Sequence, residues 1–301
     1  MDNLISSVPK GTKETFWVLI SSSTVFIFLR FYYKQRRGRG LHRDDLVLFA
    51  AWLPLVANGI IITVILDLLN SAQTTPPSVD TLNSMVLLGM FSTTLSLMSQ
   101  AWSKSSFAIT LLYVSDGWMA YFLWFAIISI NSLVGTAALL FWIGCTPLEK
   151  SWRPLVEGTC WDVRINIVFN IIVSAYSGVM DLLFAAMSWK IILPLNLEIK
   201  EKMGCVIAMS MGIFAGAAAF IKCSKFPSID PENMGDTMQL AIWSVVEPAV
   251  TIIAASIPAL RLLVRSFAAK KQPAAKDAEE KFASDPSHTF HSRRLRRGTQ
   301  T

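Results

Sequence analysis

The segment that decides the fold is WMAYFLWFAIISINSLVGTAALLFWIG, residues 118–144. It contains no Asp, Glu, Lys or Arg. It also exceeds the roughly 20 residues that a helix needs to cross a hydrocarbon core about 30 Å thick. A single strand in lipid would leave its backbone N–H and C=O groups unpaired, whereas a helix pairs them internally. The segment therefore predicts a membrane-spanning helix.

Apolar stretches of this kind recur along the whole chain. Of its 301 residues, 53% are hydrophobic and 16% are charged, and the mean hydropathy is +0.47. A soluble domain carries about 25% charged residues, so this chain has too few charges to coat a water-facing surface. The expected fold is an all-α polytopic membrane protein, a bundle of seven transmembrane helices. The predicted spans are residues 15–33, 46–68, 82–113, 118–144, 163–189, 203–222 and 237–264.

The distribution of Lys and Arg predicts the orientation. Bases close to a helix end resist translocation, so the basic loop after the first span is expected to stay in the cytoplasm. This places the N-terminus outside and the C-terminus in the cytoplasm. The basic residues that determine this topology are Lys34, Arg36, Arg37, Arg39 and Arg43.

The same orientation divides the chain into three parts. Residues 1–14 are a short outer N-terminus, 15–265 are the membrane domain, and 266–301 are a basic cytoplasmic tail that is expected to be disordered because it has little apolar surface to bury. The outer segment 222–236 is assigned two bases, Lys222 and Lys225. The net charge of +6 does not indicate a nucleic-acid partner, since the bases gather beside apolar runs.

Four cysteines bear on the outer loop. Cys145 and Cys160 bound a loop on the side of the membrane where disulfides persist, which favours a bond between them. Cys223 lies near the same face and remains a competing partner. Cys205 falls near the cytoplasmic end of the sixth span, where a free thiol is expected.

Three ionisable residues lie deep within predicted spans. Lys104, Asp181 and Glu247 are each on the order of 14–15 Å from a span end, so they can share one layer of the membrane. Buried charges are costly unless paired, and we expect an intramembrane polar cluster to which Asn170 also belongs. The main interpretation is a structural clamp between helices. A ligand pocket, a proton-sensitive switch and an acid/base pair are the alternatives.

Several signals of other protein classes are absent from the sequence. The last span has no lysine to which retinal could be linked, so no cofactor is expected. The sequence has no phosphate-binding Gly-rich loop, no HExxH and no nucleophile elbow. The histidines lie on the opposite side from the outer cysteines, so no metal site is expected. In the sixth span, Ala208, Gly212 and Gly216 recur every four residues, which favours close approach of another helix.

Several short motifs occur along the chain in a characteristic order and spacing. They are Arg43-Asp44-Asp45, Ser103-Lys104-Ser105-Ser106-Phe107, Cys145-Thr-Pro147, Gly158-Thr-Cys160, Trp243-Ser-Val-Val-Glu247 and Ile257-Pro258-Ala-Leu-Arg261. Together they resemble the large fungal family of rhodopsin-like integral membrane proteins, the group that includes a satratoxin-cluster membrane protein and appressorium receptor-like proteins. The resemblance runs from about Arg30 to Leu263, and it implies the seven-span fold and the outer disulfide.

Three functions from different classes fit these features. The first is a receptor-like sensor of a small apolar or extracellular ligand, with a cytoplasmic signalling partner read through inner residues such as Lys200 and Lys202. The second is an accessory or transport protein of a fungal secondary-metabolite pathway. The least favoured is an intramembrane cyclase that uses Asp181 and Glu247 as acid and base. The lipid bilayer is the expected surrounding, and the plasma membrane is favoured over an endomembrane.

Overall fold

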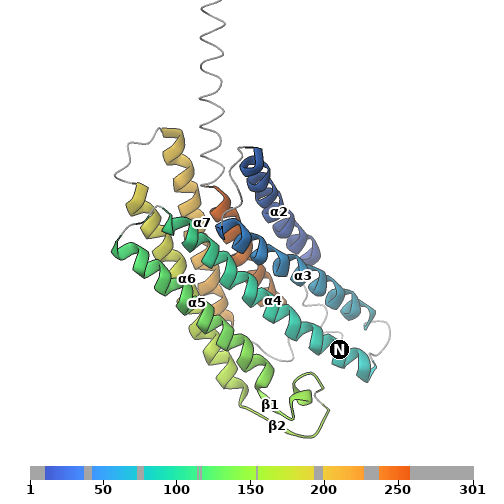
Figure 1. Cartoon of the computed structure of the whole chain (residues 1–301). Coiled ribbons are helices and arrows are strands. Elements are labelled where there is room, and N and C mark those ends of the chain that lie inside the picture. The colour runs from blue at the N-terminus through green and yellow to red at the C-terminus, as the bar shows by residue number, and fades with distance from the viewer. Residues whose placement is uncertain are drawn as a thin grey trace, which may run out of the picture. The chain divides into compact units, whose positions relative to one another are not determined.

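The computed structural model describes residues 11–36, 43–72, 78–113, 115, 117–153, 155–192, 199–226 and 237–257. Within these residues the chain forms seven long helices (Figure 1). Six of them are long and apolar enough to cross a membrane, and α7 is the seventh. The predicted all-α, seven-helix membrane fold is confirmed. The helices are α2 (Thr12–Arg36), α3 (Arg43–Ser71), α4 (Val79–Leu112), α5 (Trp118–Ile143), α6 (Val163–Ile192), α7 (Ile199–Lys225) and a last, unlabelled helix (Thr237–Ile257).

The predicted tail, residues 266–301, lies outside the described residues, as does the end of the last predicted span beyond Ile257. Met1–Pro258 forms one compact unit, and it is the unit described below. The N-terminus of α4 is fixed by Ser78, whose side-chain oxygen accepts a hydrogen bond from the backbone N–H of Thr81. This N-cap satisfies one of the N–H groups that the first turn of a helix leaves unpaired.

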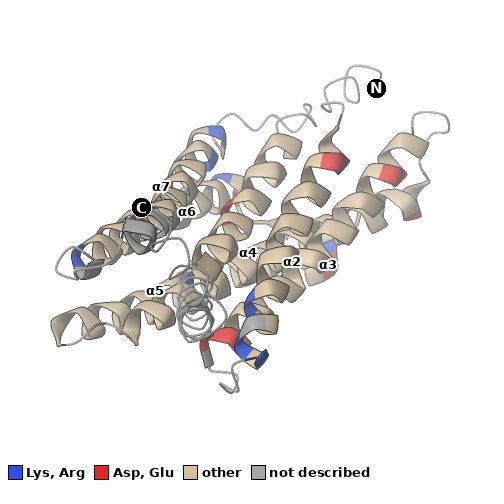
Figure 2. Cartoon of the chain, turned by 90° about the horizontal axis from the view of Figure 1, so that it is seen from above, with Lys and Arg blue, Asp and Glu red and all other residues tan. Residues whose placement is uncertain are grey.

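Outward-facing side chains on the helices are large and apolar. On α5, Tyr121 is 77% exposed, and Ile128 and Leu139 are each 63% exposed. Figure 2 shows that most of each helix carries no charged residue. Exposed apolar surface on this scale is unfavourable in water but is what a lipid-facing helix requires.

The last helix is the most deeply enclosed element. Every residue from Val245 to Ser256 is buried. Its apolar side chains join those of α2, α3, α4, α5 and α6 in one core, in which Ile20, Leu55 and Leu123 are almost fully buried. Around this helix, α3 packs along α4, α4 along α5, and α6 along α7.

Glycine residues allow α6 and α7 to pack at close range. A Cβ atom added at Gly178 would lie 3.2 Å from the Gly216 carbonyl oxygen and 3.2 Å from the Ala219 Cβ. A Cβ atom added at Gly216 would lie 3.2 Å from the Gly178 carbonyl oxygen. Small residues at four-residue spacing allow this approach, as expected for Gly212 and Gly216. The side chain of Ala208 lies outside the described residues.

We expect Gly178→Val to push α6 and α7 apart and to lower the free energy of unfolding by about 1–3 kcal/mol, the usual cost of overpacking. Gly135→Val on α5 is the matched control, because a Cβ atom there meets nothing within 4 Å. Unfolding of the two variants in bicelles measures the difference. Equal stability of the two variants would show that α6 and α7 are not closely packed at Gly178.

The loop after α5 forms a small hairpin. Strands β1 (Cys145–Thr146) and β2 (Thr159–Cys160) pair in antiparallel fashion with Cys145 opposite Cys160, and a disulfide joins these two residues. The predicted pairing is therefore confirmed. Cys223 is a free, half-buried thiol on α7. The side chain of Cys205 lies outside the described residues. The disulfide ties the end of α5 to the start of α6.

Candidate functional site

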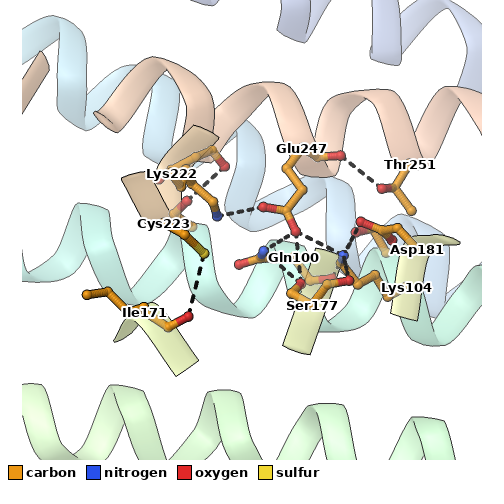
Figure 3. A network of polar contacts seen from close by, with 12 residues as sticks. Gln100, Lys104, Ile171, Ser177, Asp181, Lys222, Cys223, Glu247 and Thr251 are labelled. Carbon is orange, nitrogen blue, oxygen red and sulfur yellow. Dashed lines mark hydrogen bonds and ion pairs between the residues drawn. The ribbon is translucent and has the colours of Figure 1, made fainter. Parts of the chain in front are cut away.

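Four charged side chains meet inside the bundle, and we call them the central charge cluster: Lys104, Asp181, Lys222 and Glu247. They come from α4, α6, α7 and the last helix, respectively. The Lys104 Nζ lies 2.5 Å from the Asp181 Oδ2 and 2.9 Å from the Glu247 Oε1. The Lys222 Nζ lies 2.5 Å from the Glu247 Oε2 (Figure 3). The ion pairs therefore form a chain that runs from Asp181 to Lys104, then to Glu247 and finally to Lys222.

The cluster is fully enclosed and balanced in charge. Lys104 and Glu247 are 0% exposed, and Asp181 and Lys222 are each 4% exposed. An isolated charge at this depth would carry a large desolvation cost, which pairing with an opposite charge offsets in part. Two ammonium groups face two carboxylates, so no net charge remains. These ion pairs therefore link the four helices to one another.

Neutral side chains complete the coordination of Glu247. The Ser177 hydroxyl donates to its Oε1 at 2.9 Å, and the Gln100 amide also donates to this oxygen. Gln100 further donates to the Ser177 Oγ at 3.1 Å, and Lys104 donates to the Ser177 carbonyl oxygen at 3.1 Å (Figure 3). Gln100 lies one helical turn before Lys104, and Ser177 lies one turn before Asp181, so each pair shares a helix face. These two neutral partners were not predicted from the sequence.

A cavity of about 380 Å³ lies beside the cluster. Its walls include Phe141 near the end of α5, Val163 at the start of α6 and Thr237 at the start of the last helix. It is therefore at the end of the bundle that carries the disulfide hairpin. Gln100 and Lys222 line it as well. Both residues also contact Glu247, so a molecule in the cavity would touch the two side chains that hold this carboxylate.

The structure brings together three of the residues singled out in the sequence, Lys104, Asp181 and Glu247. It places Asn170 elsewhere. The Asn170 amide donates to the Asn166 carbonyl oxygen at 2.8 Å, one turn earlier on α6, and both residues line the cavity. Asn170 is thus a residue of the cavity wall and does not pair with the charges in any hydrogen bond found among the described residues.

The assignment of Lys222 to the outer segment 222–236 was wrong. The helix α7 continues to Lys225, and the Lys222 side chain turns inward to Glu247. A sequence signal for this existed. Ala215, Ala218, Ala219 and Lys222 are all buried and follow the i, i+3, i+4, i+7 spacing of one helix face.

A second group of charges, which we call the Arg30 cluster, joins α2 to α3 and to the last helix. It consists of Arg30, Lys34, Asp44 and Asp45, and its guanidinium is almost fully buried. The Arg30 Nε donates to the Asp45 Oδ1 at 2.8 Å, and its two other nitrogens donate to Asp44 and to the Ala255 carbonyl oxygen. The Lys34 Nζ lies 2.5 Å from the Asp45 Oδ2. This group was not predicted from the sequence as a cluster.

Two of the five topology determinants, Lys34 and Arg36, have described side chains. Lys34 belongs to the Arg30 cluster, and Arg36 is exposed at the end of α2. Arg37 and Arg39 lie outside the described residues, as does the side chain of Arg43. The orientation of the termini therefore stays a prediction.

Comparison with known proteins places the chain in a family. The family model described as "Fungal rhodopsin domain" matches residues 29–266, most of the chain. The chain belongs to this fungal rhodopsin family. It is 32% identical over 132 residues to "Satratoxin biosynthesis SC1 cluster protein 4" of Stachybotrys chartarum. That alignment covers 43% of this chain and 47% of the relative, less than half of the length of either protein. No solved structure matches the chain.

Membership of the fungal rhodopsin family agrees with a multi-pass protein embedded in a lipid bilayer. The family name raises the question of retinal, whose Schiff base would need a lysine on the last helix. In this fungal rhodopsin domain, the described last helix, Thr237–Ile257, contains no lysine. The lysine beside the cavity, Lys222, comes from α7, and its amine is ion-paired with Glu247. The described residues do not fit a retinal linkage on the last helix.

Proposed function

We propose that this fungal rhodopsin domain is a membrane sensor whose cavity binds a small, predominantly apolar molecule. The observation that carries the proposal is the dual role of Gln100 and Lys222, which line the cavity and also contact Glu247. A ligand shifts a conformational equilibrium only if it binds the two conformations differently. A ligand that contacts Gln100 and Lys222 more favourably in one arrangement of Glu247 than in another provides such a difference.

The last helix offers a route from the cavity to the opposite part of the bundle. Glu247 belongs to the central charge cluster, and eight positions further on the Ala255 carbonyl oxygen accepts a hydrogen bond from Arg30. At 1.5 Å per residue these two points are about 12 Å apart along the helix. A displacement of the last helix at Glu247 would therefore change the contacts of the Arg30 cluster, which supports signalling over a purely static clamp.

We further propose that the disulfide hairpin and the cavity face the outside and that the Arg30 cluster faces the cytoplasm, in the plasma membrane. Disulfides persist in oxidising compartments, which supports this placement of the hairpin. The basic residues that follow α2 support the same orientation. We expect no covalently bound retinal, and we expect a cytoplasmic partner to read the inner ends of the helices.

A role in a secondary-metabolite pathway is the second candidate, and one observation favours it. The relative from Stachybotrys chartarum carries "Satratoxin biosynthesis" in its name. In that case the cavity would carry or protect a metabolite. The cyclase interpretation is weaker, because no Asp or Glu is among the described residues that line the cavity.

A cavity-filling substitution tests the sensor against the metabolite role. Ala241 lines the cavity, and Ala241→Phe would occupy it without removing a polar group. Ala217→Phe on the exposed face of α7 is the matched control. Each variant replaces the native copy in the host fungus, and transcripts and secreted metabolites are measured at equal protein abundance.

A sensor predicts that Ala241→Phe abolishes the transcriptional response of the strain to its own spent medium, whereas Ala217→Phe retains it. A drop in one family of metabolites with unchanged transcription would favour the metabolite role instead. If Ala241→Phe behaves like its control in both measurements, the cavity has no part in the function and the proposal is wrong.

A further inference from the structure

We infer that the ligand of the cavity is a compact, uncharged molecule that carries a hydroxyl or carbonyl oxygen on a hydrocarbon frame. This inference rests on the proposed function in taking the cavity as the ligand site. It goes further in naming the chemical class. The class follows from the charges beside the cavity, from the polar groups in its wall and from its size.

The charges beside the cavity are already neutralised. Lys222 is the charged residue among the described residues that line the cavity, and its ammonium is paired with Glu247 at 2.5 Å. Glu247 and Asp181 together balance Lys104 and Lys222. An anionic ligand would add an uncompensated buried charge, or would take Lys222 from Glu247 and leave that carboxylate to Lys104 alone. Either outcome carries the cost of burying a charge without a full partner. The cavity therefore favours an uncharged ligand.

The remaining polar groups in the wall are neutral amides and hydroxyls. Asn58 accepts a hydrogen bond from the Ser92 hydroxyl at 2.5 Å, and Asn170 donates to the Asn166 carbonyl oxygen at 2.8 Å. A side-chain amide provides two N–H donors and one acceptor oxygen. Each of these hydrogen bonds therefore uses only part of the hydrogen-bonding capacity of the asparagine amide. A ligand that displaces water from these amides without replacing its hydrogen bonds loses affinity. This requirement favours a ligand with an oxygen over a plain hydrocarbon.

The rest of the wall is apolar, and the volume is small. A cavity of about 380 Å³ lies near the lower end of the range of about 300–1,000 Å³ that ligand pockets occupy. Apolar ligands gain free energy roughly in proportion to the apolar surface that they bury. A compact hydrocarbon frame fits these walls better than a long flexible chain. The apolar wall residues include Ile62, Leu97, Phe141, Ile167, Val173 and Leu240.

Three probes that share the adamantane hydrocarbon frame test the proposed ligand class: 1-adamantyl methyl ketone, 1-adamantanecarboxylate and 1-ethyladamantane. The full chain is purified in lipid nanodiscs at neutral pH, and binding is measured by calorimetry and by the shift in Tm. We expect the ketone to bind at least about tenfold more tightly than either the carboxylate or the hydrocarbon, a difference of about 1.4 kcal/mol. Ala241→Phe should abolish this binding, and Ala217→Phe should preserve it.

The outcomes that would overturn the inference are distinct. Carboxylate binding as tight as that of the ketone would show that the cavity accepts an anion. Hydrocarbon binding as tight as that of the ketone would remove the requirement for oxygen. Binding of no probe, or binding that survives in Ala241→Phe while the purified variant stays folded, would show that the cavity is not a site for such molecules. A smaller filling substitution, Ser244→Leu, replaces Ala241→Phe if that variant does not fold.

This experiment separates the ligand class from the sensor role. Selective binding of the ketone together with unchanged transcription in the cavity-filled strain would support the ligand class and contradict the sensor. Loss of the transcriptional response in the cavity-filled strain, with preferential binding of the carboxylate, would support the sensor and contradict the ligand class.

Discussion

Replacing Glu247 by glutamine is expected to lower the free energy of unfolding by about 3–5 kcal/mol, the usual cost of removing one partner from a buried ion pair. Glu247 contacts both lysines of the central charge cluster. Without its charge, Lys104 keeps Asp181, but Lys222 is left as an unpaired ammonium that is 4% exposed. Reversible unfolding in bicelles measures the loss. The charge of Glu247, and not its shape, is responsible, since glutamine is nearly isosteric.

The matched control is Glu157→Gln, because Glu157 is exposed in the hairpin loop. Its expected effect is within about 0.5 kcal/mol, as for most surface substitutions. Equal stability of the two variants would mean that Glu247 is not an essential ion-pair partner. It would also remove the basis for the coupling between cavity and cluster.

Replacing Arg30 by glutamine is the second substitution with a large expected effect, also about 3–5 kcal/mol. The guanidinium of Arg30 contacts Asp44 and Asp45 and donates to the Ala255 carbonyl oxygen. Its loss leaves two buried carboxylates to the single ammonium of Lys34. It also frees the last helix at Ala255, so hydrogen exchange in the last turns of this helix should accelerate.

Arg164→Gln, on the exposed first turn of α6, is the control for the loss of an arginine. We expect no measurable change in unfolding or in exchange of the last helix for this variant. If Arg30→Gln matches its control in both measurements, the Arg30 cluster does not anchor the last helix. The proposed route from Glu247 to the opposite part of the bundle would then have no end point.

The membrane spans were the part of the fold that could be predicted most fully from the sequence. Residues 118–144 were expected as one span, and the structure has α5 at Trp118–Ile143. Long apolar segments determine their own state in lipid, because the backbone must satisfy its hydrogen bonds within the helix. The disulfide between Cys145 and Cys160 was favoured by the position of these residues at the two ends of one loop, with Cys223 as a competing partner, and the structure contains it.

Helix ends were less predictable, and the error at Lys222 had a consequence for function. A lysine near a predicted span end was counted as a base of the loop, although α7 carries it into the bundle. Composition does not distinguish a buried, paired lysine from a solvated one, because the difference depends on a carboxylate from another helix. Arg30 shows the same limit, since its partners at Asp44, Asp45 and Ala255 are set by tertiary packing.

The cavity could not be predicted from the sequence either. Its walls come from six helices, and no local pattern shows that Asn58, Asn166 and Asn170 face one space. The family motifs gain a physical meaning from the structure. Lys104 of the Ser103–Phe107 motif meets Glu247 of the Trp243–Glu247 motif, and Asp44 and Asp45 of a third motif hold Arg30.

The central claim is that Lys222, at the wall of the cavity, and Glu247, in the most buried helix, act as one unit. A double-mutant cycle with Lys222→Gln, Glu247→Gln and the double variant measures it most directly, by unfolding of the full chain in bicelles. The account predicts that the double variant loses less stability than the sum of the two single losses, with a coupling energy of about 1–3 kcal/mol. Losses that add to within about 0.5 kcal/mol would contradict it, because Lys222 and Glu247 would then contribute to stability independently.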